Sequence, residues 1–220
     1  EQKRLIALLK EKRQAVISHA VTKGLDPNVP MKDSGVEWLG EVPAHWEVLP
    51  AKFLFNFITS GSRGWAEHYS DDGELFFRIT NLTRDTVHPK LESIRYVSPP
   101  AGGEGERARI QIGDILISIT ADLGSVCVAS EGIEGGYVSQ HVALARPNHN
   151  IGCPAWLAYF VLGDVAKAQL LGSGYGGTKV QLSLEDIREM IIALPPKREQ
   201  HAIYQYLDGR LARLSALLEE

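Results

Sequence analysis

The residues most suggestive of chemistry form a glycine-rich stretch, GSGYGGTK, at Gly172–Lys179. It resembles the phosphate-binding pattern G-x-x-x-x-G-K-[ST], but its last two residues are inverted because Thr178 precedes Lys179. A predicted helix comes before it, whereas a phosphate loop follows a strand and opens a helix. Order and context therefore disfavour binding of a nucleotide or dinucleotide. Glycines still permit close backbone approach to a ligand. We interpret Lys179 as suited to a phosphate and Gln181 as suited to a base edge; a helix connection without contacts is the alternative.

Motifs for other enzymatic chemistries are missing from the sequence. The diproline stretch SPPA (Ser98–Ala101) lacks the aromatic residue that stacks on a flipped base in an amino-methyltransferase. Ser139, Gln140 and His141 are adjacent along a presumed strand, and no G-x-S-x-G elbow accompanies them. The seven histidines show no metal-ligand spacing. We therefore expect no catalytic residues, no metal and no bound cofactor.

Polar side chains with donor groups suited to nucleic acid gather near the turns of the β-like part. Arg, Lys, Asn and Gln have the donor geometries used on guanine and adenine edges in the major groove. A solvated surface would explain any one of them equally well. The residues expected to face DNA are Arg63, Arg78, Asn81, Arg84, Gln140, His141, Lys179 and Gln181. Of these, the expected phosphate contacts are Arg84 and Lys179, and the expected base readers are Arg78, Asn81, Gln140 and Gln181.

Composition limits the class of protein without identifying it. Hydrophobic residues make up 44% and charged residues 23% of the 220 residues, as in a globular protein with one sizeable core. No apolar run approaches the roughly 20 residues that span a membrane. Cys127 and Cys153 are isolated, so a disulfide framework or zinc site is not indicated, and a cytoplasmic location is expected. The net charge is −4, but residues 1–23 carry six bases against two acids, and a local basic face is enough to bind phosphates.

The central part of the chain reads as β-rich and irregular. Short apolar runs separated by turn signals predict strands at Phe53–Thr59, Leu75–Thr80, Ile94–Val97, Asp114–Thr120, Ser125–Ala129 and Val138–Arg146. Their uneven spacing favours an irregular antiparallel sheet or small barrel. One helix is predicted from Pro154 to about Leu171, a second begins at the capping pair Ser183 and Asp186, and the run IIAL predicts a short strand.

Both ends of the chain are predicted to be helical and to pair. Residues 1–22 carry an apolar stripe that includes Leu5, Leu9 and Val16. From about Arg198 to Glu220, apolar residues step by three and four, which is a heptad seam made of Tyr204, Leu207, Leu211, Leu214 and Leu218. We expect an antiparallel coiled coil of these two helices; padding of the sheet is the alternative. The tail LSALLEE and the start EQKRLIALLKEKRQ would join into one amphipathic helix, typical of a unit that recurs head to tail.

Several stretches resemble the DNA-specificity (S) subunit of Type I restriction–modification systems. The stretch LLKEKRQAVISHAVTKGLDPNVPMKDSGVEWLGEVPAHWEV is similar to the family's central region. The stretch GGTKVQLSLEDIREMIIALPPKREQHAIYQYLD resembles the end of a target-recognition domain that runs into the next conserved helix. GDILISIT, YVSQHVALARP and PAWLAYFVL resemble intervening elements. The resemblance covers nearly the whole chain and is most specific at its flanks.

The resemblance implies an α+β fold with one irregular, β-rich target-recognition domain between long helices. It implies the distal part of a spacer helix at 1–24, the recognition domain at 25–196 and the start of the next spacer helix at 197–220. Such a subunit reads one half of a bipartite double-stranded DNA target and docks modification (methyltransferase) and restriction subunits. S-adenosylmethionine and ATP would be bound by those partners, and self-association as a half-subunit is a further expectation. The rival interpretations are the recognition portion of a single-chain methyltransferase or endonuclease, and a helical scaffold without DNA contact.

Overall fold

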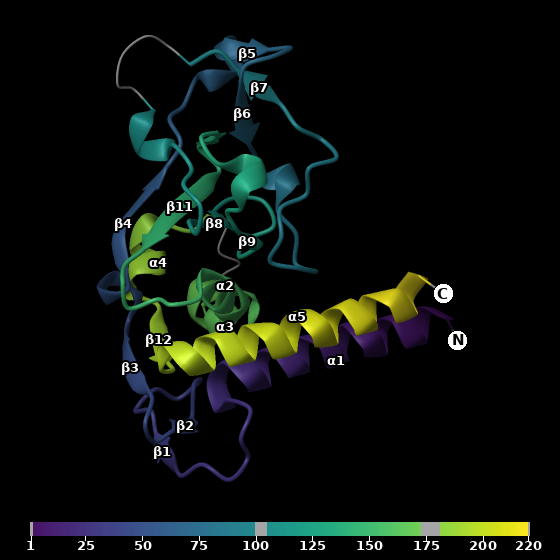
Figure 1. Ribbon diagram of the computed structural model, residues 1–220, viewed down its shortest axis with the longest axis vertical. Helices are drawn as coiled ribbons and strands as arrows, with labels where there is room; N and C mark the ends of the chain where they lie inside the picture. The colour runs from purple at the N-terminus through teal and green to yellow at the C-terminus, as the bar shows by residue number, and fades with distance from the viewer. Residues whose placement is uncertain (1, 100–104, 173–180, 220) are drawn as a thin grey trace.

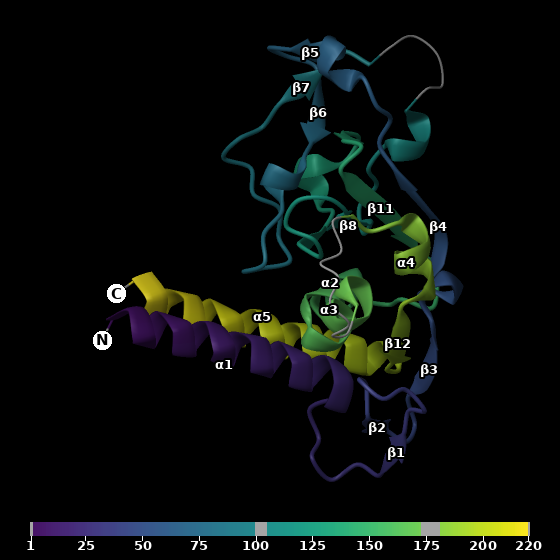
Figure 2. The same ribbon diagram turned by 180° about the vertical axis from the view of Figure 1, so that it is seen from behind.

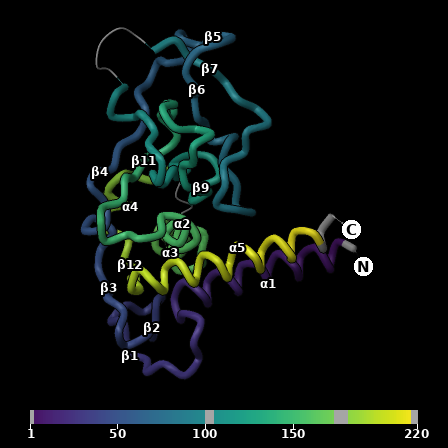
Figure 3. The backbone as a smooth tube through the Cα atoms, viewed as in Figure 1, coloured from purple at the N-terminus to yellow at the C-terminus, as the bar shows by residue number. Residues whose placement is uncertain are grey.

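The computed structural model describes residues 2–99, 105–172 and 181–219. Two long helices project together from a β-rich body, as Figures 1 and 2 show from opposite sides. They are α1 (Gln2–Lys23) and α5 (Lys197–Glu219). In the backbone tube of Figure 3 they run antiparallel and side by side, and both chain ends lie at the tip far from the body. We refer to α1 and α5 as the helix pair and to residues 24–196 as the body.

The main sheet of the body has four antiparallel strands in the order β4-β11-β8-β9. Their bounds are Phe55–Ser60 for β4, Val142–Pro147 for β11, Ile115–Ser118 for β8 and Val126–Val128 for β9. Successive side chains point to opposite faces. Ile115 and Ile117 therefore belong to the core shared with the helices, while Leu116 and Leu144 belong to a second core on the other face. The sheet is buried on both sides.

A second sheet lies beyond the main one, at the end of the body away from the helix pair (Figure 1). Its strand order is β10-β6-β7-β5, and β10 pairs with β6 in parallel. The bounds are Tyr137–Val138 for β10, Glu74–Phe77 for β6, Tyr96–Val97 for β7 and Tyr69–Ser70 for β5. One face of this sheet carries a small aromatic core of Trp65, Phe76 and Tyr137 with Val97.

Two short antiparallel ladders tie the chain together where the helix pair meets the body. β1 (Met31–Asp33) pairs with β2 (Glu41–Pro43), and β3 (Glu47–Pro50) pairs with β12 (Ile191–Leu194). The predicted strand IIAL is therefore confirmed as β12. Trp46, which follows β2, is fully buried, so this connection packs against the body.

Three shorter helices complete the body, and one prediction about them is wrong. They are α2 (Pro154–Leu162), α3 (Asp164–Leu171) and α4 (Leu184–Glu189). The single helix predicted from Pro154 to Leu171 is broken at Gly163, whose φ of −68° and ψ of 157° are extended. A side chain there would approach Phe160 O at 3.1 Å and Val21 at 3.3 Å, so α1 packs close against the break.

The predicted strands all have counterparts with shifted ends. The strand predicted at Val138–Arg146 divides into β10 and β11, because the chain leaves one sheet and enters the other at residues 139–141. The strand predicted at Leu75–Thr80 ends at Phe77, where Asn81 accepts a hydrogen bond from Arg78 N at 3.0 Å and starts a 3-10 turn at Ile79–Asn81. The capping pair Ser183 and Asp186 does start α4, with Asp186 N donating to Ser183 Oγ at 3.1 Å.

The helix pair buries a stripe that differs from the predicted one on α1. On α5, Leu207, Leu211 and Leu214 are buried and Tyr204 is half-buried, as predicted; the side chain of Leu218 lies outside the described residues. On α1, Leu9 and Val16 are half-buried, but Leu5 is 55% exposed and is not part of the seam. The buried stripe of α1 is made of Arg13, Ile17, Ala20 and Val21, which face both α5 and α2.

Candidate nucleic-acid interface

One end of the main sheet gathers loops that carry Arg63, Gln140 and His141, three of the residues predicted to face DNA. β4 and β8 finish at this end, and β11 and β9 begin there, because neighbouring strands are antiparallel. The loops are therefore residues 61–64 after β4, 119–125 between β8 and β9, and 139–141 before β11. We call these three loops, with Gln181, the reading end.

Backbone hydrogen bonds hold the segments of the reading end against one another. Gly61 N donates to Ser139 O at 3.3 Å, and Ser139 N donates to Phe77 O at 2.8 Å. The residues beside these bonds are Arg63, Gln140 and Arg78, from segments far apart in the sequence. Predicted residues from three separate segments are thus brought to one place.

A second set of backbone bonds adds the last segment. Ile119 N donates to His141 O at 3.1 Å, and Leu182 N donates to Ile119 O at 2.9 Å. Gln181 therefore lies beside the end of β8 and close to the His141 segment, and its side chain is exposed. Lys179, predicted with it, lies outside the described residues.

The loop of Arg63 is fixed at both of its ends. A side chain at Gly61 would stand 1.9 Å from Val138 O, so only glycine permits this crossing of the chain. Trp65, at the other end of the loop, is 3% exposed and stacks on Phe76 with ring centroids 5.8 Å apart. Gly64 between them has a φ of +85°. Arg63 itself is exposed and forms no ion pair within the described part of the chain.

Gln140 and His141 present polar groups at the crossover between the two sheets. Gln140 is half-buried and His141 is exposed. The Nε2 atoms of the two side chains lie 3.1 Å apart. An amide and an imidazole on a short segment fixed by backbone bonds are able to exchange hydrogen bonds with base edges.

Two of the predicted arginines already have partners. Arg84 Nε lies 2.7 Å from Asp122 Oδ1, and its Nη2 donates to Leu123 O at 2.8 Å. Arg78 Nη2 donates to Ser93 O at 3.2 Å. The Arg84 side chain is 42% exposed, and an exposed pair of this kind contributes little and exchanges partners at low cost. Arg84 is therefore held beside the 119–125 loop, and its contact with a phosphate stays a prediction.

Asn81 does not face solvent. It is 2% exposed, and its amide nitrogen donates to Lys90 O at 2.8 Å and to Ser93 O at 3.2 Å. Its oxygen accepts from Arg78 N. With these hydrogen bonds made inside the body, the side chain holds the surrounding loop closed, and we do not retain Asn81 among the residues that contact bases.

Sequence reasoning missed the 119–125 loop as part of the site. In the sequence its stretch ADLGS is a turn signal between the strands predicted at Asp114–Thr120 and Ser125–Ala129. Asp122 adopts a positive φ of 53° and accepts a hydrogen bond from Ser125 Oγ, which fixes the turn. A positive φ at aspartate is compatible with many loops, so the sequence held no signal that the turn would lie beside His141.

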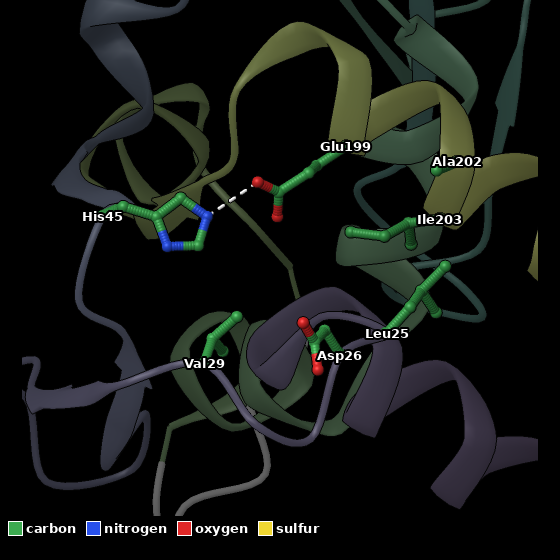
Figure 4. Close-up of a pocket in the computed structure, with 7 residues that line it drawn as sticks. All are labelled: Leu25, Asp26, Val29, His45, Glu199, Ala202 and Ile203. Carbon is green, nitrogen blue, oxygen red and sulfur yellow. Dashed lines mark hydrogen bonds and ion pairs between the residues drawn. The ribbon is translucent and has the colours of Figure 1, made fainter.

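One hollow of the described surface lies at the base of the helix pair. A cavity of about 380 Å³ is walled by Leu25, Val29 and Ile203, with His45 and Glu199 at its rim, as the close-up in Figure 4 shows. His45 Nε2 lies 2.7 Å from one Glu199 oxygen, and Trp46 Nε1 donates to the other at 2.9 Å. Glu199 is thus a structural carboxylate that joins α5 to the turn between β2 and β3.

Among the described residues, the cysteines and the possible metal ligands form no further site. Burial raises the pKa of the Cys127 thiol and of the Cys153 thiol, so both stay protonated and unreactive in the folded protein. Among the described residues, no three His, Cys, Asp or Glu side chains are grouped closely enough to hold a metal ion. Within the same residues, no helix has both the length and the apolar character needed to cross a membrane.

In this fold, loops from distant segments meet at one end of a β-rich body, and a helix pair carries that body. Residues 92–219 match the family model described as the Type I restriction modification DNA specificity domain. This match covers more than half of the chain, and the protein belongs to that family. No curated protein matches the chain.

Solved structures of S subunits share the fold. The chain is similar to the crystal structure of the HsdS subunit from Thermoanaerobacter tengcongensis, with a TM-score of 0.65 and 21% identity over 98% of this chain and 46% of that one. A structure of a type I R-M system described for its complex assembly and conformational transition gives 0.65 and 20%, over 99% and 50%. The Type I S subunit from M. genitalium gives 0.54 and 15%, over 99% and 53%. The chain thus spans about half the length of these relatives.

Proposed function

We propose that this chain reads one half of a bipartite double-stranded DNA target as a specificity subunit, or a part of one, in a Type I restriction–modification complex. The observation that carries the proposal is the convergence at the reading end. Arg63, Arg78, Gln140 and Gln181 come from segments far apart in the sequence, and backbone hydrogen bonds bring those segments together. Membership of the DNA specificity domain family supplies the class of ligand.

At the reading end, the residues suited to phosphates differ from the residues suited to base edges. Arg63 and Arg84 are exposed cations at its margins, suited to phosphates, which position the protein but carry no sequence information. Gln140 and His141 lie between them on the crossover segment, where amide and imidazole groups suit base edges. Gln181, beside the end of β8, would extend the same surface, and Lys179 stays a predicted phosphate contact outside the described residues.

We assign the reaction itself to partner subunits. Modification subunits would supply adenine methylation from S-adenosylmethionine, restriction subunits would supply ATP-dependent steps, and the whole complex would work in the cytoplasm. The chain would contribute recognition alone, with 1–24 and 197–220 as spacer helices and 25–196 as the recognition domain. The missing aromatic residue in the diproline stretch supports this division, since a flipped adenine would have nothing to stack on there.

The outer surface of the helix pair is the place we propose for the modification subunits. A groove of about 450 Å³ lies between the two helices. It is lined by Lys12, Val16 and His19 of α1 and by Tyr206 of α5. Tyr206 is 46% exposed, and Leu5 and Leu8 are more than half exposed nearer the tip. Exposed apolar side chains along a helix pair support a contact surface for another protein, and a second copy of this chain is the alternative occupant.

A salt-dependence measurement tests DNA binding at the reading end. The affinity of the chain for duplex DNA should fall steeply with salt, and Arg63→Ala should weaken binding on every sequence and reduce the salt slope by about 1. Arg188→Ala is the matched control, because Arg188 is exposed but paired with Glu185 on α4, away from the reading end. Equal slopes for Arg63→Ala and the parent protein would exclude this surface as the phosphate contact.

A further inference from the structure

A closed loop of the body reaches across to the middle of the helix pair. It runs from Asn81 to Lys90, and Lys90 N donates to Asn81 O at 2.8 Å at its base. The side chain of Asn81 closes the same base from inside. Val87 is fully buried in the main core and its carbonyl accepts from Val128 N at 2.9 Å. Figure 1 shows the segment between β6 and β7 descending from the body toward α5. We call residues 82–89 the bracing loop.

The tip of the bracing loop contacts both helices of the pair. Asp85 Oδ1 accepts from Arg13 Nη1 of α1 at 3.1 Å. His88 Nε2 lies 3.1 Å from Asp208 Oδ1 of α5. Arg13 also donates through Nη2 to Ser215 Oγ, so the same guanidinium joins α1 to α5. One loop of the body thus contacts both helices, through the Arg13–Asp85 ion pair and the polar contact between His88 and Asp208.

Arg13 lies in a buried position, where a charged side chain is unfavourable unless it is paired. Its side chain is 8% exposed and lies in the seam of the helix pair, in line with Ile17 and Ala20. A buried guanidinium remains charged and needs a carboxylate near it. That carboxylate comes from the body, through Asp85, whose side chain is 65% exposed. An apolar residue at position 13 would pack the seam without a contact to Asp85.

The position of this contact along the helices gives it leverage. Arg13 lies ten residues before the end of α1, which is about 15 Å along its axis. Nearer the body, α1 is held by α2 and α3, where Gln14 donates to Leu162 O at 2.8 Å and Ser18 accepts from Asp164 N at 2.9 Å. Arg13 lies one residue beyond Gln14, so its contact with Asp85 is at the outer edge of this base and comes from the β6–β7 segment rather than from α2. A contact at that edge opposes rocking of the helix pair about its base.

The bracing loop is also joined to the reading end. Arg84, next to Asp85, holds Asp122 and Leu123 O in the 119–125 loop. Thr83 Oγ1, on the other side, accepts from Asp85 N at 3.0 Å and fixes the tip. The path from α1 to the reading end therefore runs from Asp85 to its neighbour Arg84, and from Arg84 to Asp122 in the 119–125 loop.

We propose that the bracing loop sets the angle between the helix pair and the DNA-reading end, with Arg13 and Asp85 as the positioning residues. The proposal rests on the proposed function for its purpose, because a fixed angle would fix where the reading end meets DNA relative to the spacer. Its physical content concerns the chain alone: removal of the Arg13–Asp85 contact frees the helix pair to rock while the fold persists.

A distance measurement between two spin labels tests the bracing loop on the whole chain. Labels attached at Lys3→Cys, near the tip of α1, and at Asp71→Cys, in the turn after β5, report the angle of the helix pair. Both native cysteines are buried, so the introduced exposed thiols react selectively. In Asp85→Asn and in Arg13→Gln the distribution of distances should widen about twofold, because hinge motion about the base is no longer opposed.

Two controls make the outcome decisive. Glu189→Gln removes the carboxylate of a comparable pair with Lys52, 2.8 Å apart and confined to the body, and should leave the distribution unchanged. Asp85→Glu keeps the charge and should keep the distribution narrow. Unchanged widths in both Asp85→Asn and Arg13→Gln would overturn the proposal, as would equal widening in Glu189→Gln. The measurement needs no DNA, so a failure of the proposed function would show separately, as absent binding in the salt series.

Discussion

The body and the helix pair differ in charge as clearly as they differ in shape. Residues 24–196 contain thirteen Lys and Arg against twenty-one Asp and Glu, whereas residues 1–23 and 197–220 contain ten against six. The part proposed to read DNA is thus acidic, and the part proposed as spacer is basic. Recognition here would depend on a few placed cations at the reading end rather than on a basic total. Acidic surface elsewhere on the body would disfavour other docking orientations, since like charges repel phosphates.

The two regions also differ in how their glycines are used. Gly61 in the body lies where two segments cross, and any side chain would collide with Val138 O. Gly209 in α5 has open space around the position of a side chain. The body therefore depends on single positions for its geometry, and the helix pair depends on a repeated pattern that tolerates change. Substitutions in the two regions should consequently change the free energy of unfolding by different amounts, and even in opposite directions.

The largest effect is expected where the two regions share a core. Trp156 of α2 is fully buried in the cluster that also contains Ile17 of α1 and Leu207 of α5. Trp156→Ala should lower the free energy of unfolding by about 3–5 kcal/mol. Urea unfolding followed by circular dichroism measures this. Trp38→Ala, at a 45% exposed tryptophan, should change it by no more than about 0.5 kcal/mol. Comparable losses in the two variants would show that α2 does not join the body to the helix pair.

A smaller effect is expected at the reading end. Gly61→Ala forces the 61–64 loop away from Val138 and should destabilise the protein by about 1–3 kcal/mol, as overpacking does. DNA affinity should fall at temperatures where the variant is still folded, because Arg63 is displaced with the loop. The unfolding curve and the binding titration of the same sample give both quantities. Normal affinity in a destabilised Gly61→Ala protein would separate the loop from recognition.

The smallest effect is expected on the helix pair, and it has the opposite sign. Gly209→Ala replaces a glycine in a helix interior without a collision, so it should stabilise the protein by about 0.5–1 kcal/mol. DNA affinity should stay that of the parent protein. In urea unfolding, the midpoint should rise while the dependence of the free energy of unfolding on urea concentration stays the same. A loss of stability would mean that α5 needs the narrow surface which glycine leaves at this position.

The sequence predicted the periodic parts of the molecule better than the crossings between them. Leu207, Leu211 and Leu214 are buried as the heptad seam requires, and each of the six strands has a counterpart. The prediction that Leu5 belongs to the seam is wrong, because α1 also packs against α2. This second contact shifts the buried stripe of α1 to Arg13 and Ile17. Helix periodicity shows that one face is buried, but it does not show how many neighbours the face meets.

The site was predictable by residue type and less so by environment. Arg63, Gln140, His141 and Gln181 are at least partly accessible and their segments meet, yet no local pattern in the sequence indicates that they meet. Asn81 shows most clearly that residue type does not reveal the environment. Its amide would suit an adenine edge equally well, but in the structure it donates hydrogen bonds to the Lys90 and Ser93 carbonyls. The break at Gly163 was hidden for a similar reason, since it accommodates α1, which is distant in sequence.

Sequencing of adenine-methylated sites tests the central claim most directly. The chain would be co-expressed with its modification subunits, and the methylated sites would be compared between the parent protein and Gln140→Ala. We expect one bipartite motif for the parent, with relaxed preference at one base position of one half in the variant, by about 1–3 kcal/mol of discrimination. Gln181→Ala should relax a base position of the same half. An identical motif in the parent and both variants would contradict the account, because the reading end would then not read the sequence.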